Sequence, residues 1–147
     1  MRLLLLAATA ALMLGMALPV QASLRSDVLQ AIHLVENPQD VRRPGRHGEL
    51  GAYQFRPETW RMHSAEPFVQ ALDRSASDAV AVEHFEWICR GLARAHVPVT
   101  AYNIALAWNG GLYAAVKGRV PAAARDYAER VNNLVEEMRT QQLAGVN

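Results

Sequence analysis

A single glutamate lies where a carboxyl group could act as an acid. Glu36 follows Ile32 by four residues, so it continues the apolar side of a helix at the end of that helix. A carboxyl group there is half buried, and the loss of water contact raises its pKa and can keep it protonated near neutral pH. A general acid needs this property. An exposed glutamate at a frayed helix end is the alternative, and position alone leaves both open.

A second segment, GELGAYQF, contains polar side chains that suit binding of a polar ligand. Tyr53 and Gln54 follow the glycines Gly48 and Gly51. Glycine lets a backbone bend and approach a neighbour closely, and Gln offers a hydrogen-bond donor and an acceptor together. A glycine-rich loop that leads into a short strand with core aromatics is the alternative interpretation.

A third segment, ALAWNGGLY, ends a helix with Trp108 and Asn109. Trp, Tyr and amide side chains gathered in a groove suit sugars, which present apolar ring faces and many hydroxyl groups. Asn109 can equally be an ordinary residue at a helix end. Gly110 is expected as the left-handed residue that terminates the helix.

Further ionisable residues are weaker candidates. Asp40 and Glu49 lie in the loop after Glu36 and could supply a second carboxylate, although solvated loop charges are the simpler interpretation. Glu49 is also the rival for the acid, but it is expected in an exposed turn, where desolvation is weaker. The histidines show no metal-ligand spacing such as H-E-x-x-H, so no metal site is predicted. Each of them is expected on the surface or in a loop: His33, His47, His63, His84 and His96.

Helical periodicity must position these side chains. Asn37-Pro38 ends the first helix because a residue before proline avoids the helical region. Pro57 and Pro67 each open a short helix, and Thr100 can cap the helix that runs to Gly110. Three apolar stripes predict longer helices: Leu24, Val28, Ile32 and Val35; Ala81, Phe85, Ile88 and Leu92, in a helix that starts near Ser77; and Tyr127, Val131, Leu134 and Met138. The predicted fold is mainly α, with little or no β-sheet and a long early loop.

The N-terminus has the pattern of a secretory signal peptide. Arg2 precedes an apolar run over Leu3–Leu18, and Val20-Gln21-Ala22 resembles an A-x-A cleavage site. We therefore expect a signal peptide over residues 1–22 and one mature domain over residues 23–147, located in the periplasm or secreted. An uncleaved membrane anchor is the alternative, although the apolar run is somewhat short for a spanning helix.

Composition narrows the classes of partner. The 147 residues include 15 Lys+Arg and 14 Asp+Glu, and removal of Arg2 leaves 14 of each. A balanced charge gives no electrostatic footprint for nucleic acid. The single cysteine, Cys89, cannot form a disulfide within the chain, and we expect it to be a buried structural thiol.

In their order, these segments resemble the soluble-type lytic transglycosylases of the lysozyme-like superfamily. That family shows a helix ending in E-S, then G-L-M-Q, a P-x-T helix start, an A-x-x-Y-N-A-G segment and a Y-V pair on a last helix. The corresponding letters here are LVEN, GAYQ, PET, AWNGG and DYAERV, between about Asp27 and Val135. The chain departs from the family pattern at Asn37, Ala52-Tyr53, Trp108 and Gly110.

The resemblance implies a lysozyme-like fold with an active-site cleft and an enzyme that cuts peptidoglycan. The bond would be the β-1,4 linkage between N-acetylmuramic acid and N-acetylglucosamine. Glu36 would protonate the departing oxygen and then deprotonate the 6-hydroxyl group of the sugar, which closes a 1,6-anhydro ring. No metal or organic cofactor is needed for these steps.

The resemblance also implies roles for the other candidates. Gln54 and Asn109 would hold the N-acetyl group or hydroxyl groups of the substrate. Tyr53 and Trp108 would line the groove, and Tyr127 would orient Glu36.

Two other functions stay open on the same scaffold. One is a lysozyme-type hydrolase, which uses a second carboxylate, and the other is a non-catalytic peptidoglycan-binding protein. The expected partner is the peptidoglycan glycan strand, and a secretion or conjugation machine of the cell envelope is the class of protein partner to consider. A monomer is the default expectation.

Overall fold

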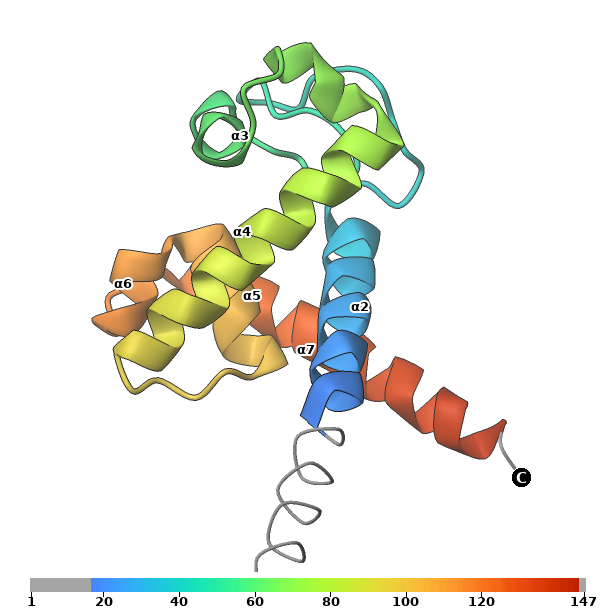
Figure 1. Cartoon of the computed structure of the whole chain (residues 1–147), viewed down its shortest axis with the longest axis vertical. Helices are drawn as coiled ribbons and strands as arrows, with labels where there is room; N and C mark the ends of the chain where they lie inside the picture. Colours follow the sequence, from blue (N-terminus) through green and yellow to red (C-terminus); the bar gives the residue numbers. More distant parts are fainter. Residues whose placement is uncertain (1–16, 146–147) are drawn as a thin grey trace, which may run out of the picture.

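The computed structural model describes residues 17–145, so most of the predicted signal peptide and residues 146–147 lie outside the described residues. Within this range no helix is both long and apolar enough to cross a membrane. The helices, drawn in Figure 1, are α2 (Ala17–Glu36), α3 (Pro57–His63), the 3-10 helix η1 (Phe68–Leu72), α4 (Arg74–Arg94), α5 (Ala101–Gly110), α6 (Leu112–Val116) and α7 (Ala122–Ala144).

The described part of the chain is almost free of β-structure. Its one strand pairing is an isolated antiparallel bridge between Leu50 and Phe55, in the loop before α3. The bridge closes a tight turn in which both backbone N–H groups donate to the opposite carbonyl at 3.0 Å. The prediction of a mainly α fold is therefore confirmed.

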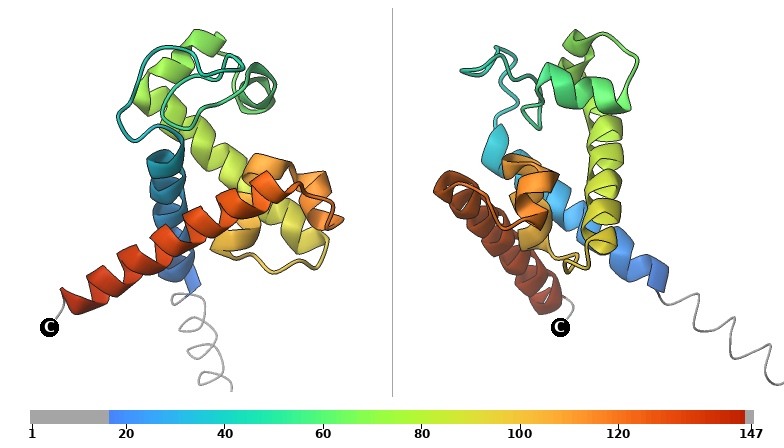
Figure 2. Two further views of the ribbon diagram at one scale, coloured as in Figure 1. Left: turned by 180° about the vertical axis from the view of Figure 1, so that it is seen from behind. Right: turned by 90° about the vertical axis from the view of Figure 1, so that its left-hand side faces the viewer.

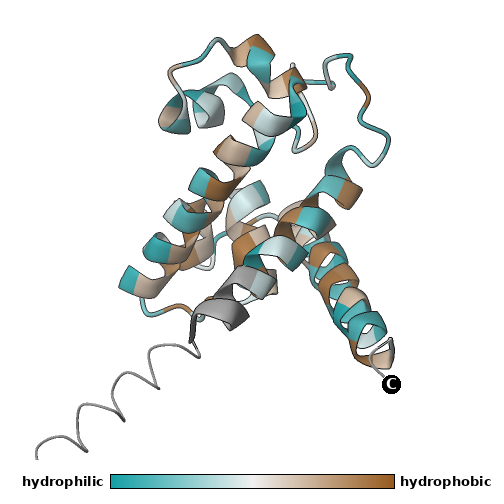
Figure 3. Ribbon diagram, turned by 45° about the vertical axis from the view of Figure 1, so that its right-hand side comes forward, coloured by the Kyte–Doolittle hydropathy of each residue, from teal (hydrophilic) through white to brown (hydrophobic). Residues whose placement is uncertain are grey.

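The helices pack around one core. α4 runs from the end of the molecule that holds α3 and η1 to the end that holds α5 and α6 (Figure 1). α7 packs against α5 and α2, and the left view of Figure 2 shows it crossing α2. Apolar and polar residues alternate along these helices (Figure 3), as amphipathic packing requires. The largest fully buried side chains are Trp60, Phe85, Ile32, Ile88, Leu92, Ile104, Val28, Val131 and Val135.

Local sequence explains where α4 and α5 begin. The Asp73 side chain accepts a hydrogen bond from the backbone N–H of Ala76 at 2.8 Å, so α4 starts before the predicted position near Ser77. All four residues of its predicted apolar stripe are buried. Thr100 caps α5 as predicted, because its hydroxyl oxygen accepts from the backbone N–H of Asn103. Cys89 on α4 is buried, as expected, and burial raises the pKa of its thiol to about 11.

The loop after α2 is fixed to the end of that helix by Asn37. Its side-chain NH₂ group donates to the carbonyl oxygens of Val41 at 3.0 Å and Gly51 at 3.1 Å. Its amide oxygen accepts from the backbone N–H of Val41 at 2.8 Å. Because Asn37 is buried, these bonds hold the loop against the helix in a setting where water competes weakly.

Gly51 brings the loop into backbone contact with η1. Its φ angle is +79°, and a Cβ atom at this position would lie 1.8 Å from the carbonyl oxygen of Ala71. No residue with a side chain fits there without a shift of the backbone. The close approach that the two glycines of GELGAYQF predict is thus found at Gly51.

The short helix predicted after Pro67 is present as the 3-10 helix η1. One local prediction is wrong: Gly110 lies inside α5, and Gly111 is the terminating residue with positive φ (+87°). Gly111 is followed at once by α6, a short helix that no periodic stripe predicts because it spans only five residues.

Candidate functional site

A cleft of about 480 Å³ opens where the end of α2, the loop before α3 and the end of α5 meet. It is lined by five of the six side chains predicted for catalysis or ligand binding: Glu36, Tyr53, Gln54, Trp108 and Asn109. The sixth, Tyr127, lies in the core next to Glu36 and does not line the cleft. The other lining residues are Glu49, Phe55, Arg56, Thr59, His84, Gly110 and Gly111.

The environment of Glu36 favours its protonated form. Glu36 is the last residue of α2, so its side chain leaves the helix between the core and the cleft. Burial is the largest effect and raises the pKa of Glu36 to about 7. The interaction with Tyr127 opposes this rise, the charge of Glu49 adds to it, and the charge of Arg130 again opposes it. A carboxyl group with this pKa can both donate and accept a proton near neutral pH.

Tyr127 reaches Glu36 from the core side. The ring is 3% exposed, and burial and the adjacent Glu36 raise the pKa of the phenol well above its usual value, so it keeps its proton. The hydroxyl group makes no hydrogen bond of good geometry to any described residue, yet its interaction with Glu36 lowers the pKa of that carboxyl group. We interpret the contact as loose in this state. A phenol O–H is a stronger partner for a carboxylate than for a neutral acid, so ionisation of Glu36 favours a shorter contact.

Glu49 lines the same cleft but has the opposite tendency. Partial burial alone would raise its pKa, but backbone N–H groups, including that of His47 at 2.8 Å from Oε2, outweigh burial and lower the pKa. Arg56 adds an ion pair at 3.5 Å. The cleft therefore holds one carboxyl group that favours the proton and one that favours the charge.

Asp40 lies elsewhere. It pairs with His33 at 2.9 Å and approaches Arg74 at 3.8 Å, on the side of the loop that faces η1 and α4. Since Asp40 does not line the cleft, Glu49 is the carboxylate closer to the site.

The turn that contains Gln54 holds its amide group in place. Gln54 has a φ angle of +48°, and its Nε2 donates to the carbonyl oxygen of Gly51 at 2.9 Å. A Cβ atom on Gly45 would lie 2.8 Å from Oε1 of Gln54, so the Gly45 backbone packs directly against that amide. One N–H of the amide group is used by the turn, while the other N–H and the oxygen have no hydrogen-bond partner among the described residues, and the side chain lines the cleft.

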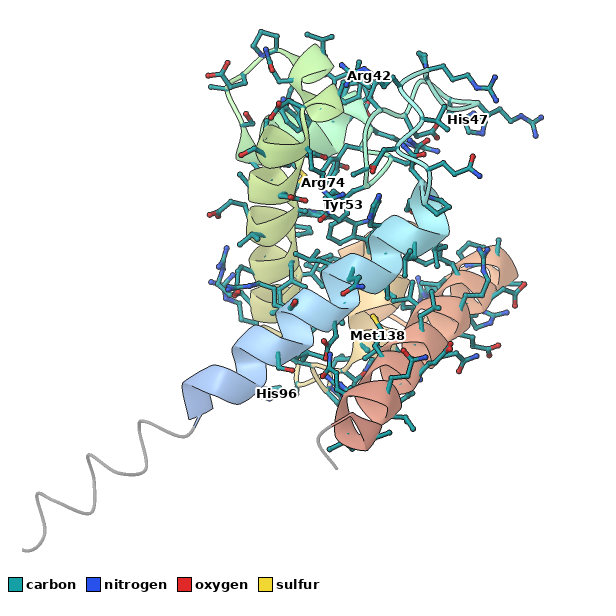
Figure 4. The ribbon with its side chains drawn as sticks, turned by 90° about the vertical axis from the view of Figure 1, so that its right-hand side faces the viewer. Arg42, His47, Tyr53, Arg74, His96 and Met138 are labelled. Atoms are coloured by element: carbon teal, nitrogen blue, oxygen red, sulfur yellow. The ribbon has the colours of Figure 1, made fainter. Side chains whose placement is uncertain are left out.

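Tyr53 contributes its ring rather than its hydroxyl group. The side chain is 4% exposed, and its O–H donates to Asp78 of α4 at 2.7 Å. Figure 4 shows Tyr53 and Arg74 next to each other between α2 and α4, and the Arg74 guanidinium lies 5.9 Å from the centre of the ring. The hydroxyl group is thus committed to the protein, and the ring supports Trp108, 6.2 Å away between ring centres.

The end of α5 supplies an aromatic face and a free amide. Trp108 is half-buried and packs against Phe55 with ring centres 5.8 Å apart. Asn109 is exposed and has no hydrogen-bond partner among the described side chains. Gly111 ends the helix at this point, so both side chains lie at the edge of the cleft.

One lining residue overturns a prediction made from the sequence. His84 was expected on the surface or in a loop, but it lies on α4, is 7% exposed and lines the cleft. Its ring nitrogen Nδ1 is 2.9 Å from Nε2 of His63. The sequence carries a signal for this placement, since His84 lies four residues after Val80 and four before Ile88, on the buried side of α4.

Comparison with known proteins gives no relative for this chain: no protein-family model, curated protein or solved structure matches it. The function is therefore inferred from the residues of the cleft.

Proposed function

We propose that the protein is a peptidoglycan lytic transglycosylase in which Glu36 is the only acid and base. The observation that carries this proposal is the raised pKa of Glu36 at a cleft that also offers the aromatic face of Trp108 and the amide groups of Gln54 and Asn109. Sugars need this combination, because their rings are apolar on the faces and polar at the edges.

The chemistry follows from a pKa of about 7 for Glu36. The protonated acid gives its proton to the glycosidic oxygen as the bond between that oxygen and the sugar carbon C1 breaks. The N-acetyl oxygen of the substrate then stabilises the positive charge at C1. The Glu36 carboxylate removes the proton from the 6-hydroxyl group, whose oxygen bonds to C1 and forms the 1,6-anhydro ring. Tyr127 stabilises the carboxylate between the two steps.

We also propose a lysozyme-like fold. The support is the mainly α architecture, with a loop-rich end that carries Glu49 and Gln54 and a helical end that carries Asn109, and a cleft between them. Export to the periplasm or outside the cell, peptidoglycan strands as the partner and a monomeric state belong to the same proposal.

A lysozyme-type hydrolase is the second candidate, and Glu49 is the observation that favours it. Its carboxylate lines the same cleft as Glu36 and is held ionised. Two carboxyl groups whose pKa values are pushed apart are the usual pair in such hydrolases.

One substitution series separates these functions from a non-catalytic peptidoglycan-binding protein. Purified wild-type protein, Glu36→Gln and Glu49→Gln are incubated with peptidoglycan, and the soluble products are analysed by mass spectrometry. We expect the wild type to release products that end in anhydro sugar, lighter by one water than hydrolysed ends. Glu36→Gln should lower the rate by at least about 100-fold, as loss of a general acid does, while Glu49→Gln keeps most of it.

The alternatives give different results. Reducing sugar ends together with a large loss in Glu49→Gln would establish the hydrolase. If the wild type binds peptidoglycan but releases nothing, or if Glu36→Gln is as active as the wild type, the catalytic proposal is wrong.

A further inference from the structure

The imidazole of His84 is fixed on several sides. His63 contacts its Nδ1 at 2.9 Å, and Trp87 stacks on the ring at 5.5 Å between centres with an angle of 12°. The Trp108 ring meets it edge-on at 4.7 Å. A histidine held this firmly has one orientation, so the direction of its remaining nitrogen is defined by the fold.

Only one polar atom of the ring remains without a protein partner. Nδ1 shares a single proton with His63, whereas Nε2 has no hydrogen-bond partner among the described residues. Nε2 is not among the buried polar atoms that lack a partner, so it is open to solvent. His84 lines the cleft, and we infer that Nε2 is the atom that it exposes there.

The state of charge makes proton transfer by His84 a poor explanation. Burial, together with a smaller effect of the neighbouring His63, lowers the pKa of His84 to about 4, and burial also lowers the pKa of His63. Both rings are therefore neutral near pH 7, and a base with so low a pKa takes a proton weakly. A neutral imidazole can still give or accept one directed hydrogen bond.

We propose that His84 is a saccharide-binding residue, whose Nε2 forms a hydrogen bond with a hydroxyl or acetamido group of the sugar that packs on Trp108. This inference rests on the proposed function, because it assigns part of the same cleft to an N-acetylated sugar. His63 is the positioning residue, since its contact with Nδ1 decides whether Nε2 donates or accepts.

Two substitutions test the two nitrogen atoms of His84 separately, because each variant can replace the hydrogen bond of only one of them. The amide of His84→Asn lies near the position of Nδ1, so this variant can keep the contact with His63 but does not reach the cleft. The longer side chain of His84→Gln places its amide near Nε2, so it can reach the sugar but loses His63. Both variants remove the same aromatic ring from the core, and each is therefore the control for the other's loss of packing.

The probe is the tetramer of β-1,4-linked N-acetylglucosamine, and binding is measured by calorimetry in the Glu36→Gln background so that no turnover occurs. We expect His84→Asn to weaken binding by about 3- to 10-fold, the range of one neutral hydrogen bond. His84→Gln should weaken it less. In the protein without a His84 substitution, the NMR resonance of His84 Nε2 should shift when the tetramer is added.

Each outcome has one meaning. If both variants bind the tetramer as tightly as the Glu36→Gln protein without a His84 substitution, and the Nε2 resonance does not move, His84 only supports the core and the inference is wrong. The inference is also wrong if both variants lose the same amount of affinity and their melting temperatures fall in step. The proposed function has a separate test: it is wrong if Glu36→Gln still cleaves peptidoglycan, whatever the His84 variants do.

Discussion

Glu36 and Glu49 share a cleft but differ in ionisation, because Glu36 lies against the core whereas backbone N–H groups reach Glu49. The pKa of Glu36 rises from 4.5 to about 7 on folding. Between these values the folded chain keeps a proton that the unfolded chain loses, so stability falls as pH rises through this window and is constant above it. Burial of Glu36 thus lowers stability at neutral and higher pH.

Replacement of Glu36 by Gln should therefore stabilise the protein at high pH. We expect Glu36→Gln to raise the free energy of unfolding at pH 8 by up to about 3 kcal/mol, the size of a shift of this extent. The gain should shrink as pH falls to 4.5 and below, because the wild-type carboxyl group then becomes protonated in the unfolded state as well. Urea denaturation at pH 5 and pH 8 measures the difference.

Glu49→Gln is the matched control for this experiment. Its folded pKa is lowered, so its charge contributes stability above the unfolded pKa, and the Gln variant should be less stable than the wild type at pH 8. A Glu36→Gln variant that gains nothing at pH 8 relative to pH 5 would mean that Glu36 ionises normally, and the acid role would then lose its physical basis.

The sequence allows part of this site to be predicted. The side of α2 on which Glu36 falls follows from helical periodicity, and its desolvation follows from that side. The partners of other residues do not follow in this way. The Tyr53 hydroxyl group bonds to Asp78, twenty-five residues away, and His84 faces the cleft only because α4 passes behind Trp108. Contacts between distant segments depend on how the helices pack, which no local pattern contains.

At the scale of elements, the loop between α2 and α3 depends on one backbone contact. Gly51 and Gly48 both have positive φ angles, of +79° and +82°. A Cβ atom on Gly51 would collide with the Ala71 carbonyl group at 1.8 Å, whereas one on Gly48 would have no neighbour within 4 Å. The two glycines therefore differ in packing while sharing the same backbone conformation.

Alanine substitutions at Gly48 and Gly51 should distinguish the cost of the left-handed backbone conformation from the cost of the collision with Ala71. Gly48→Ala should cost about 1–2 kcal/mol of unfolding free energy, the cost of a left-handed non-glycine residue. Gly51→Ala should cost at least about 2 kcal/mol more, since the loop must leave η1 and expose apolar surface. Urea denaturation measures both values. Equal losses would show that the loop moves away from Ala71 at little cost.

Some helix ends are set by residues within one turn, whereas other parts of the fold are set by contacts between distant segments. Thr100 and the Asn37-Pro38 pair act within one turn, and the helix ends near them are predicted from the sequence. Asp73 caps α4 in the same local way, although the predicted start near Ser77 lies after it. The placement of η1 against the loop has another origin. The Ala71 carbonyl group of η1 meets the backbone of Gly51, twenty residues earlier, and this approach is a property of the folded chain.

At the scale of the whole molecule, α2 and α7 must stay together for the site to exist, because α2 carries Glu36 and α7 carries Tyr127. The apolar stripes on α2 and α7 indicate that one side of each helix is buried, and they favour a mainly α fold. They do not predict which helices pack against each other. An ion pair joins α2 and α7: Arg139 Nε lies 3.1 Å from Asp27 Oδ2. Asp27 is 4% exposed, and its other partner is the Ser23 hydroxyl group at 3.4 Å.

Removal of Arg139 should therefore lower the free energy of unfolding more than removal of one partner of an exposed ion pair. Arg139→Met leaves the Asp27 carboxylate buried with one weak hydrogen bond, and we expect a loss of about 1–3 kcal/mol, below the value for a fully buried pair because Arg139 is partly exposed. Asp27→Asn combined with Arg139→Met should recover part of the loss, since no charge is then buried.

Arg25→Met is the control. The pair of Arg25 with Glu86, at 3.1 Å, joins α2 to α4 with both side chains partly exposed, and it should contribute less than about 1 kcal/mol. Equal losses in Arg139→Met and Arg25→Met would mean that burial of Asp27 has no energetic weight, and the α2–α7 contact would then depend on apolar packing alone.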